Sequence, residues 1–126
     1  MLPLVVKQVI PILRIFDVAK AKEFYHDYLG FKTDWEHRFG DNFPVYMQIS
    51  LNSLVLHLTE HHGDCSPGTT VYVKVSGLAE YHRELAAKEY RYLKPGLCKE
   101  GGGLEVELSD PFGNRLRINE ELPEPQ

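Results

Sequence analysis

The chain has 126 residues, of which 43% are hydrophobic and 25% are charged, and its net charge is -4 at pH 7. This length and composition are typical of one globular domain with its own core, and the negative charge argues against a nucleic-acid-binding surface. The N-terminal stretch lacks a basic region, and Lys7 and Gln8 interrupt its apolar run. We therefore expect neither a signal peptide nor a membrane span, and we place the protein in the cytoplasm. Cys65 and Cys98 are too few for a disulfide framework and should be reduced thiols.

The first half of the chain has the pattern of a strand, a helix and three more strands. An apolar strand is predicted at 9–15, and Asp17 is a suitable N-cap for a helix that Gly30 ends. Strands are predicted at 31–38, 45–50 and 54–60, and a loop at 61–68.

The second half repeats this order. A strand is predicted at 70–76, followed by a helix after Gly77, a short strand near 90–93 and a loop at 94–103. Two alternating strands then flank the turn "DPFGN" at 110–114.

An offset of 60 residues superposes the two halves. It places Leu13 on Val73 and Leu58 on Ile118, although in the third strand it places Met47 on Glu107. We predict an α+β fold of two tandem βαβββ modules related by pseudo-twofold symmetry, with curved mixed sheets that form a cleft. The single domain would span 1–126, with module one at about 8–60 and module two at about 69–120. A general α+β fold without symmetry is the alternative.

Alternation gives each predicted sheet an apolar face and a mixed polar, aromatic and charged face. Two interpretations of the mixed face remain open. It is either a solvated surface with cross-strand ion pairs, such as Lys74 and Arg117 with Glu107, or the wall of a ligand cleft. His57 and Tyr72 favour the cleft, because a purely solvated face has little need of them.

Two stretches resemble a known superfamily. "LRIFDVAKAKEFYHDYLGF" (13–31) and "LSDPFGNRLRI" (108–118) are similar to the entry and the closing hairpin of the glyoxalase/bleomycin-resistance/dioxygenase superfamily, also called the vicinal oxygen chelate fold. The resemblance implies four metal-ligand positions, which fall here on Ile10, His57, Thr70 and Arg117. Isoleucine, threonine and arginine are unsuited to hold a divalent cation, so we expect no metal and no cofactor.

The closest resemblance is to the metal-free bleomycin-resistance branch, through "ILRIFDVAKAKEFYHDYLGFKTDW" and "VKVSGLAEYHREL". It implies a homodimer that sequesters a cationic or amphiphilic, bleomycin-like molecule in crevices between subunits, without catalysis. Gly102 stands where that branch often has a tryptophan that stacks on the ligand, so a smaller ligand is plausible. The candidate ligand-binding residues are Trp35, Phe39, Phe43, His57, Tyr72, Lys74, Glu105, Glu107, Arg115 and Arg117.

Two other functions remain open. One is a metal-dependent lyase or dioxygenase of the same superfamily with non-standard ligands such as His57, His61 and His62. The other is a small-molecule sensor or a partner subunit with no activity of its own. Metal content separates the enzyme from the sequestering protein.

Overall fold

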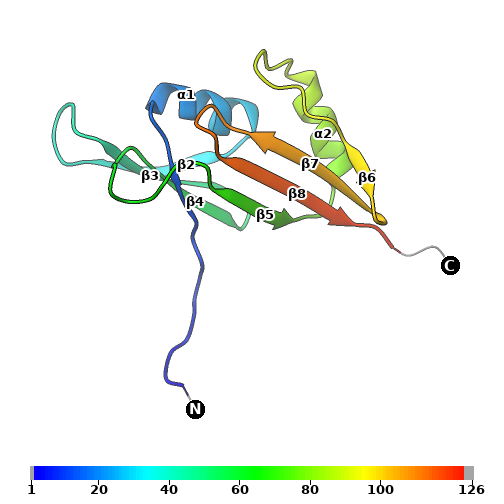
Figure 1. Ribbon diagram of the computed structural model, residues 1–126, viewed down its shortest axis with the longest axis horizontal. Coiled ribbons are helices and arrows are strands. Elements are labelled where there is room, and N and C mark those ends of the chain that lie inside the picture. The colour runs from blue at the N-terminus through cyan, green and yellow to red at the C-terminus, as the bar shows by residue number, and fades with distance from the viewer. Residues whose placement is uncertain (1, 124–126) are drawn as a thin grey trace.

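The structure, a computed structural model, describes residues 2–123. It contains two four-stranded mixed sheets, each with a helix, and both helices lie on one side of the strands (Figure 1). The strand order is β1-β4-β3-β2 in the first sheet and β5-β8-β7-β6 in the second. The predicted α+β fold of two βαβββ modules is therefore confirmed. The first module comprises β1 (Ile12–Arg14), α1 (Val18–Lys22), the π-helix η1 (Glu23–Tyr28), β2 (Lys32–Arg38), β3 (Val45–Leu51) and β4 (Leu54–Thr59). The second comprises β5 (Thr70–Lys74), α2 (Leu78–Ala87), β6 (Cys98–Glu100), β7 (Gly103–Ser109) and β8 (Arg115–Glu121).

The first helix begins and ends where the sequence predicts. The side chain of Asp17 accepts a hydrogen bond of 2.9 Å from the backbone N–H of Lys20, which satisfies one of the free donors of the first turn. The second part of the helix widens into a π-helix. Gly30 then leaves it at φ 91°, a conformation that favours glycine.

The registers of the two parallel strand pairs reproduce the 60-residue offset. Ile12 lies opposite His57 in the first module, and Tyr72 lies opposite Arg117 in the second. The third strands follow an offset of 59 instead, because Met47 pairs with Leu58 whereas Val106 pairs with Ile118. Met47 thus corresponds to the buried Val106 and not to the exposed Glu107. The turn between β7 and β8 is one residue longer than the turn between β3 and β4, and this difference causes the mismatch.

That longer turn, residues 110–114, joins the two modules. The buried Tyr25 hydroxyl donates a hydrogen bond of 2.7 Å to Asp110. The side-chain amide of Asn114 donates to the carbonyl oxygen of Arg14, also at 2.7 Å, and to Asp110 at 2.8 Å. Phe112 packs near Phe16, with ring centroids 6.1 Å apart. The apolar sheet faces and the helices then form one shared core, as the alternation predicts.

Two predictions of secondary structure are wrong in detail. No strand forms at 90–93, where the chain turns and Tyr90 packs its ring on Tyr28 at 4.4 Å. The short strand of this module is instead β6 at Cys98–Glu100, inside the predicted loop. The predicted first strand also shortens to β1, which leaves residues 2–10 as an extended arm that points away from the sheets (Figure 1). Among residues 2–123, no helix has the length and apolarity needed to cross a membrane.

Candidate functional site

A β-bulge in β2 places Trp35 on the mixed face of the first sheet. Thr33 pairs with Ile49 and Trp35 pairs with Gln48, so Asp34 is an extra residue between two pairs. Regular alternation would have turned Trp35 toward the core, and a bulge re-aims the side chains that follow it. Asp34 and Trp35, although adjacent in sequence, therefore lie on the same face. Trp35, a candidate ligand-binding residue, thus reaches the mixed face because of the bulge.

Three aromatic side chains meet on this face. The rings of Trp35 and Tyr46 are nearly parallel, at an interplanar angle of 13° and with centroids 6.0 Å apart. The His57 ring lies edge-on to both, at 5.3 Å from Trp35 and 5.1 Å from Tyr46. Trp35 is 43% exposed. We call this group of Trp35, Tyr46 and His57 the aromatic platform.

A chain of hydrogen bonds behind the platform determines which ring nitrogen of His57 carries the hydrogen. The amide nitrogen of Gln48 donates to Asp34 at 3.1 Å, so its oxygen must accept the 2.9 Å hydrogen bond from His57 Nε2. In the neutral imidazole, His57 Nδ1 is then the acceptor, and the Tyr46 hydroxyl donates to it at 2.7 Å. Both ring nitrogens of His57 are therefore occupied by neighbours.

Burial and hydrogen bonding shift the pKa values of the platform side chains and of the carboxylate behind them. Burial lowers the pKa of His57, because a charged imidazole is poorly solvated there. The hydrogen bond from Gln48 is the main cause that lowers the pKa of Asp34, with a further hydrogen bond from Ser50. Burial also raises the pKa of Tyr46, and the nearby Asp64 adds to this effect. At neutral pH the platform thus has a neutral aromatic surface above an ionised carboxylate.

An open cavity of about 370 Å³ adjoins the platform. Its size is within the range of small-molecule pockets. Phe39 lines it, whereas Phe43 is not among its lining residues and lies in the adjacent loop, where its backbone oxygen accepts a hydrogen bond from Arg38. The cavity is lined by Trp35, His37, Phe39, Tyr46, His61 and Asp64.

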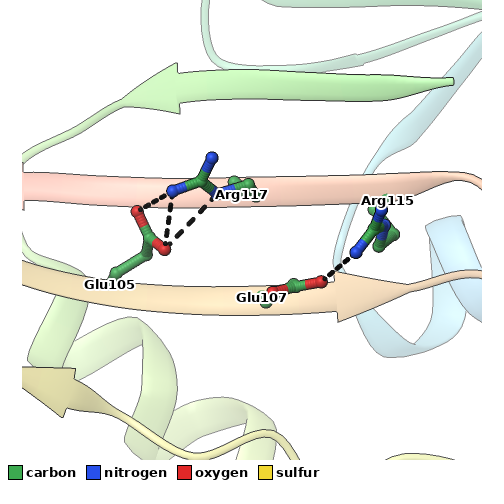
Figure 2. A network of polar contacts seen from close by, with 4 residues as sticks. All are labelled: Glu105, Glu107, Arg115 and Arg117. Atoms are coloured by element: carbon green, nitrogen blue, oxygen red, sulfur yellow. Dashed lines mark hydrogen bonds and ion pairs between the residues drawn. The ribbon is translucent and has the colours of Figure 1, made fainter.

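The mixed face of the second sheet is a set of ion pairs (Figure 2). Figure 2 shows two of them: Arg115 pairs with Glu107 at 2.9 Å, and Arg117 with Glu105 at 3.2 Å. Lys74 pairs with Glu121 at 2.6 Å. Cross-strand ion pairs, one of the two interpretations left open by the sequence, are present, but Lys74 and Arg117 do not pair with Glu107. Glu107 lies directly opposite Arg117 in the β7–β8 register. It nevertheless accepts a hydrogen bond from Arg115, its diagonal neighbour. The charges of this face are neutralised within it.

Tyr72 lies within this ionic face. The Arg117 guanidinium lies 5.2 Å from the centre of its ring, a cation–π distance. The hydrogen bond and the charge of Glu121 raise the pKa of Lys74, and Lys74 in turn lowers the pKa of Glu121. Tyr72 and Arg117 are both about half exposed, so this face remains accessible.

The structure does not gather the residues of a metal site. Between Leu2 and Pro123, no three His, Cys, Asp or Glu side chains lie close enough to share an ion. The alternative that relied on His57, His61 and His62 therefore lacks a ligand set in this part of the chain. His57 and Arg117 do occupy equivalent positions in the two modules, as the offset predicted.

The candidate residues thus fall into two groups on two sheets. Trp35, Phe39 and His57 come together on the first, and Tyr72, Lys74, Glu105, Glu107, Arg115 and Arg117 on the second. The cavity beside the platform takes side chains from the first group only. Sequence reasoning missed Tyr46, Gln48 and Asp34, and also His37, which lines the cavity. Alternation from His57 across the hairpin could have found Tyr46 and Gln48, but nothing in the sequence marks the bulge at Asp34.

The fold and the platform define a class of protein, the paired-βαβββ proteins with a cavity on the outer sheet face. Within this class, the chain belongs to the glyoxalase superfamily, because the model described as "Glyoxalase superfamily protein" matches residues 2–124. A search of the curated proteins found no match to this sequence.

Solved structures share the fold at low sequence identity. The antibiotic binding protein TnmS3 from Streptomyces sp. CB03234 is 18% identical over 94% of this chain and 98% of its own, with a TM-score of 0.72. A bleomycin-binding protein complexed with bleomycin is 24% identical over 92% and 99%, with a TM-score of 0.66. A glyoxalase-related enzyme from Clostridium phytofermentans is 17% identical over 95% and 98%, with a TM-score of 0.74. Binding proteins and enzymes thus share this architecture.

Proposed function

We propose that the protein binds and sequesters a cationic or amphiphilic small molecule with a flat aromatic part, without converting it. The aromatic platform is the main support, because it offers exposed ring surface while the polar atoms of Tyr46 and His57 are engaged with each other and with Gln48. Rings of this kind bind planar or cationic groups through stacking and cation–π contacts. The similarity to antibiotic-binding and bleomycin-binding proteins agrees with this function. We place the protein in the cytoplasm, where its two free cysteines would stay reduced.

The proposal includes a homodimer. In one chain, the aromatic and the ionic faces lie on different sheets, and the cavity beside the platform is lined by the first half of the chain alone. In a symmetric dimer, the aromatic platform of one copy can face the ionic face of the other, and the two together would enclose an amphiphilic ligand. Tyr72 would then be a second stacking surface.

A titration with copper-free bleomycin, followed by the fluorescence of Trp35, tests the proposal, since this is the only tryptophan in the chain. We expect saturable quenching at about one ligand per subunit. In isothermal titration calorimetry, Tyr46→Leu should weaken binding at least about tenfold. The matched control is Tyr92→Leu, which removes an exposed ring on the helix side.

Metal content distinguishes the enzyme from the binding protein. Stoichiometric metal in the purified protein, together with no response to bleomycin, would contradict sequestration and favour a metal-dependent lyase or dioxygenase. Equal loss of affinity in Tyr46→Leu and Tyr92→Leu would place the ligand away from the platform.

A further inference from the structure

The Tyr46 hydroxyl and the His57 imidazole form a phenol–imidazole pair at the wall of the open cavity. The hydroxyl oxygen and His57 Nδ1 are 2.7 Å apart, a short distance for a hydrogen bond from a hydroxyl. Gln48 lies opposite His57 in the β3–β4 register, and Tyr46 is two residues before Gln48 on the same face. Two neighbouring strands therefore hold the phenol against the imidazole.

The hydrogen bonds of this pair suit the transfer of the phenol proton. His57 Nε2 donates to the oxygen of Gln48 at 2.9 Å, so Nδ1 is the nitrogen that accepts from Tyr46. When the proton moves to Nδ1, the resulting imidazolium keeps both hydrogen bonds. The ionised carboxylate of Asp34, bonded to the amide nitrogen of Gln48, favours that positive charge.

Ordinary acid–base chemistry leaves the proton on Tyr46. Burial raises the pKa of the Tyr46 hydroxyl and lowers the pKa of His57, so the uncharged phenol and imidazole are the stable forms. Loss of one electron reverses this balance, because an oxidised phenol is a strong acid and even a weak base takes its proton. The pair is therefore arranged for electron loss that is coupled to proton transfer.

Trp35 gives the pair a route to the surface. Its ring is nearly parallel to that of Tyr46, at 13° and with centroids 6.0 Å apart, and Trp35 is 43% exposed. Among residues 2–123, the other tyrosine that donates to an ionisable side chain is Tyr25, which bonds Asp110 and is only 1% exposed. Within this range, Tyr46 thus combines a proton acceptor with access to a soluble oxidant.

We propose that the aromatic platform gives one electron to a soluble one-electron oxidant, such as an organic radical, and that Tyr46 is the donor. The electron passes to the oxidant through the exposed ring of Trp35 or directly in the cavity. The Tyr46 O–H bond breaks and an N–H bond forms at His57 Nδ1, which leaves a reduced oxidant, a neutral tyrosyl radical and an imidazolium. An electron from a soluble thiolate, together with the proton held by His57, then restores the tyrosine. This activity goes beyond sequestration, because it needs an oxidant and not a bound ligand.

Flash oxidation tests the proposal. A laser flash on a ruthenium polypyridyl complex with persulfate generates a one-electron oxidant, and transient absorption and electron paramagnetic resonance follow the protein radical. We expect a rapidly formed tyrosyl radical that Tyr46→Phe removes and Tyr92→Phe, at an exposed ring on the helix side, does not.

The role of His57 has its own pair of variants. His57→Gln keeps an oxygen that can accept from the hydroxyl but cannot hold the proton, so it should slow radical formation at least about a hundredfold. The matched control is His62→Gln, at an exposed loop position, which should leave the rate unchanged. A rate unaffected by His57→Gln, or a tryptophan radical that persists without a tyrosyl radical, would overturn the proposal.

The unmodified protein gives a second test, which does not depend on the folding of a variant. Radical formation should be slower in heavy water than in ordinary water, because the proton moves together with the electron. Equal rates in the two solvents would overturn coupled transfer to His57. Sequestration is measured separately by calorimetry, so either proposal can fail while the other stands.

Discussion

Asn114 and Arg14 lie 100 residues apart in sequence, and the side-chain amide of Asn114 donates a hydrogen bond of 2.7 Å to the Arg14 carbonyl oxygen. The same side chain accepts from the backbone of Thr69 at 3.1 Å. One buried asparagine in the turn 110–114 therefore bonds both to module one, at Arg14, and to Thr69, the residue before β5.

Asn114→Ala should lower the free energy of unfolding by about 3 kcal/mol, because several buried polar partners would lose their hydrogen bonds. Denaturant unfolding measures this change, and Lys99→Ala at an exposed position is the control. A loss no greater than that of the control would mean that water replaces the asparagine.

The Trp35 fluorescence should report the protonation of His57. Because burial lowers the pKa of His57 from 6.5, the folded protein binds this proton less readily than the unfolded chain does. Stability attributable to His57 is therefore fully present above pH 6.5 and falls as the pH drops through the lower folded pKa. A fluorescence titration should show a midpoint below 6.5 that His57→Gln removes and His62→Gln does not. A midpoint above 6.5 would contradict a neutral imidazole beneath the tryptophan.

Arg117 should matter for ligand binding more than for stability. Its pair with Glu105 is partly exposed, so Arg117→Gln should change the free energy of unfolding by less than about 1 kcal/mol. If the ionic face completes the ligand cleft, the affinity for bleomycin should still fall at least about tenfold. Lys22→Gln, which breaks a similarly exposed pair with Glu36, is the control. Unchanged affinity would remove Arg117 from the ligand site.

Gly102→Trp should strengthen bleomycin binding, since it restores a stacking ring before β7. A Cβ atom added at this position meets no atom within 4 Å, but the backbone φ of 82° favours glycine. We therefore expect a stability cost of about 1–2 kcal/mol together with tighter binding, measured by calorimetry. Weaker binding would show that this strand end lies outside the cleft.

The repeat of strand, helix and three strands could be predicted from the sequence because apolar alternation and turn residues are local signals. The equivalence of His57 and Arg117 followed from it and is present in the structure. The orientation of Trp35 could not be predicted, since the bulge at Asp34 depends on how β2 pairs with β3. The partner of Arg117 was also missed, because register fixes which residues face each other but not which diagonal neighbour a long side chain reaches.

The single additional residue in the turn of module two makes the two halves of a duplicated fold structurally different. With two turns of equal length, each module could contact the other in the same way, and the chain would be nearly equivalent end for end. The longer turn packs against the first module. The shorter turn, at Asn52 and Ser53, leaves a cavity of about 570 Å³ between itself and the second module. Lengthening the turn at Asn52 and Ser53 by one residue is therefore a way to make the molecule more nearly symmetric, and to learn how much of its behaviour depends on the difference between its halves.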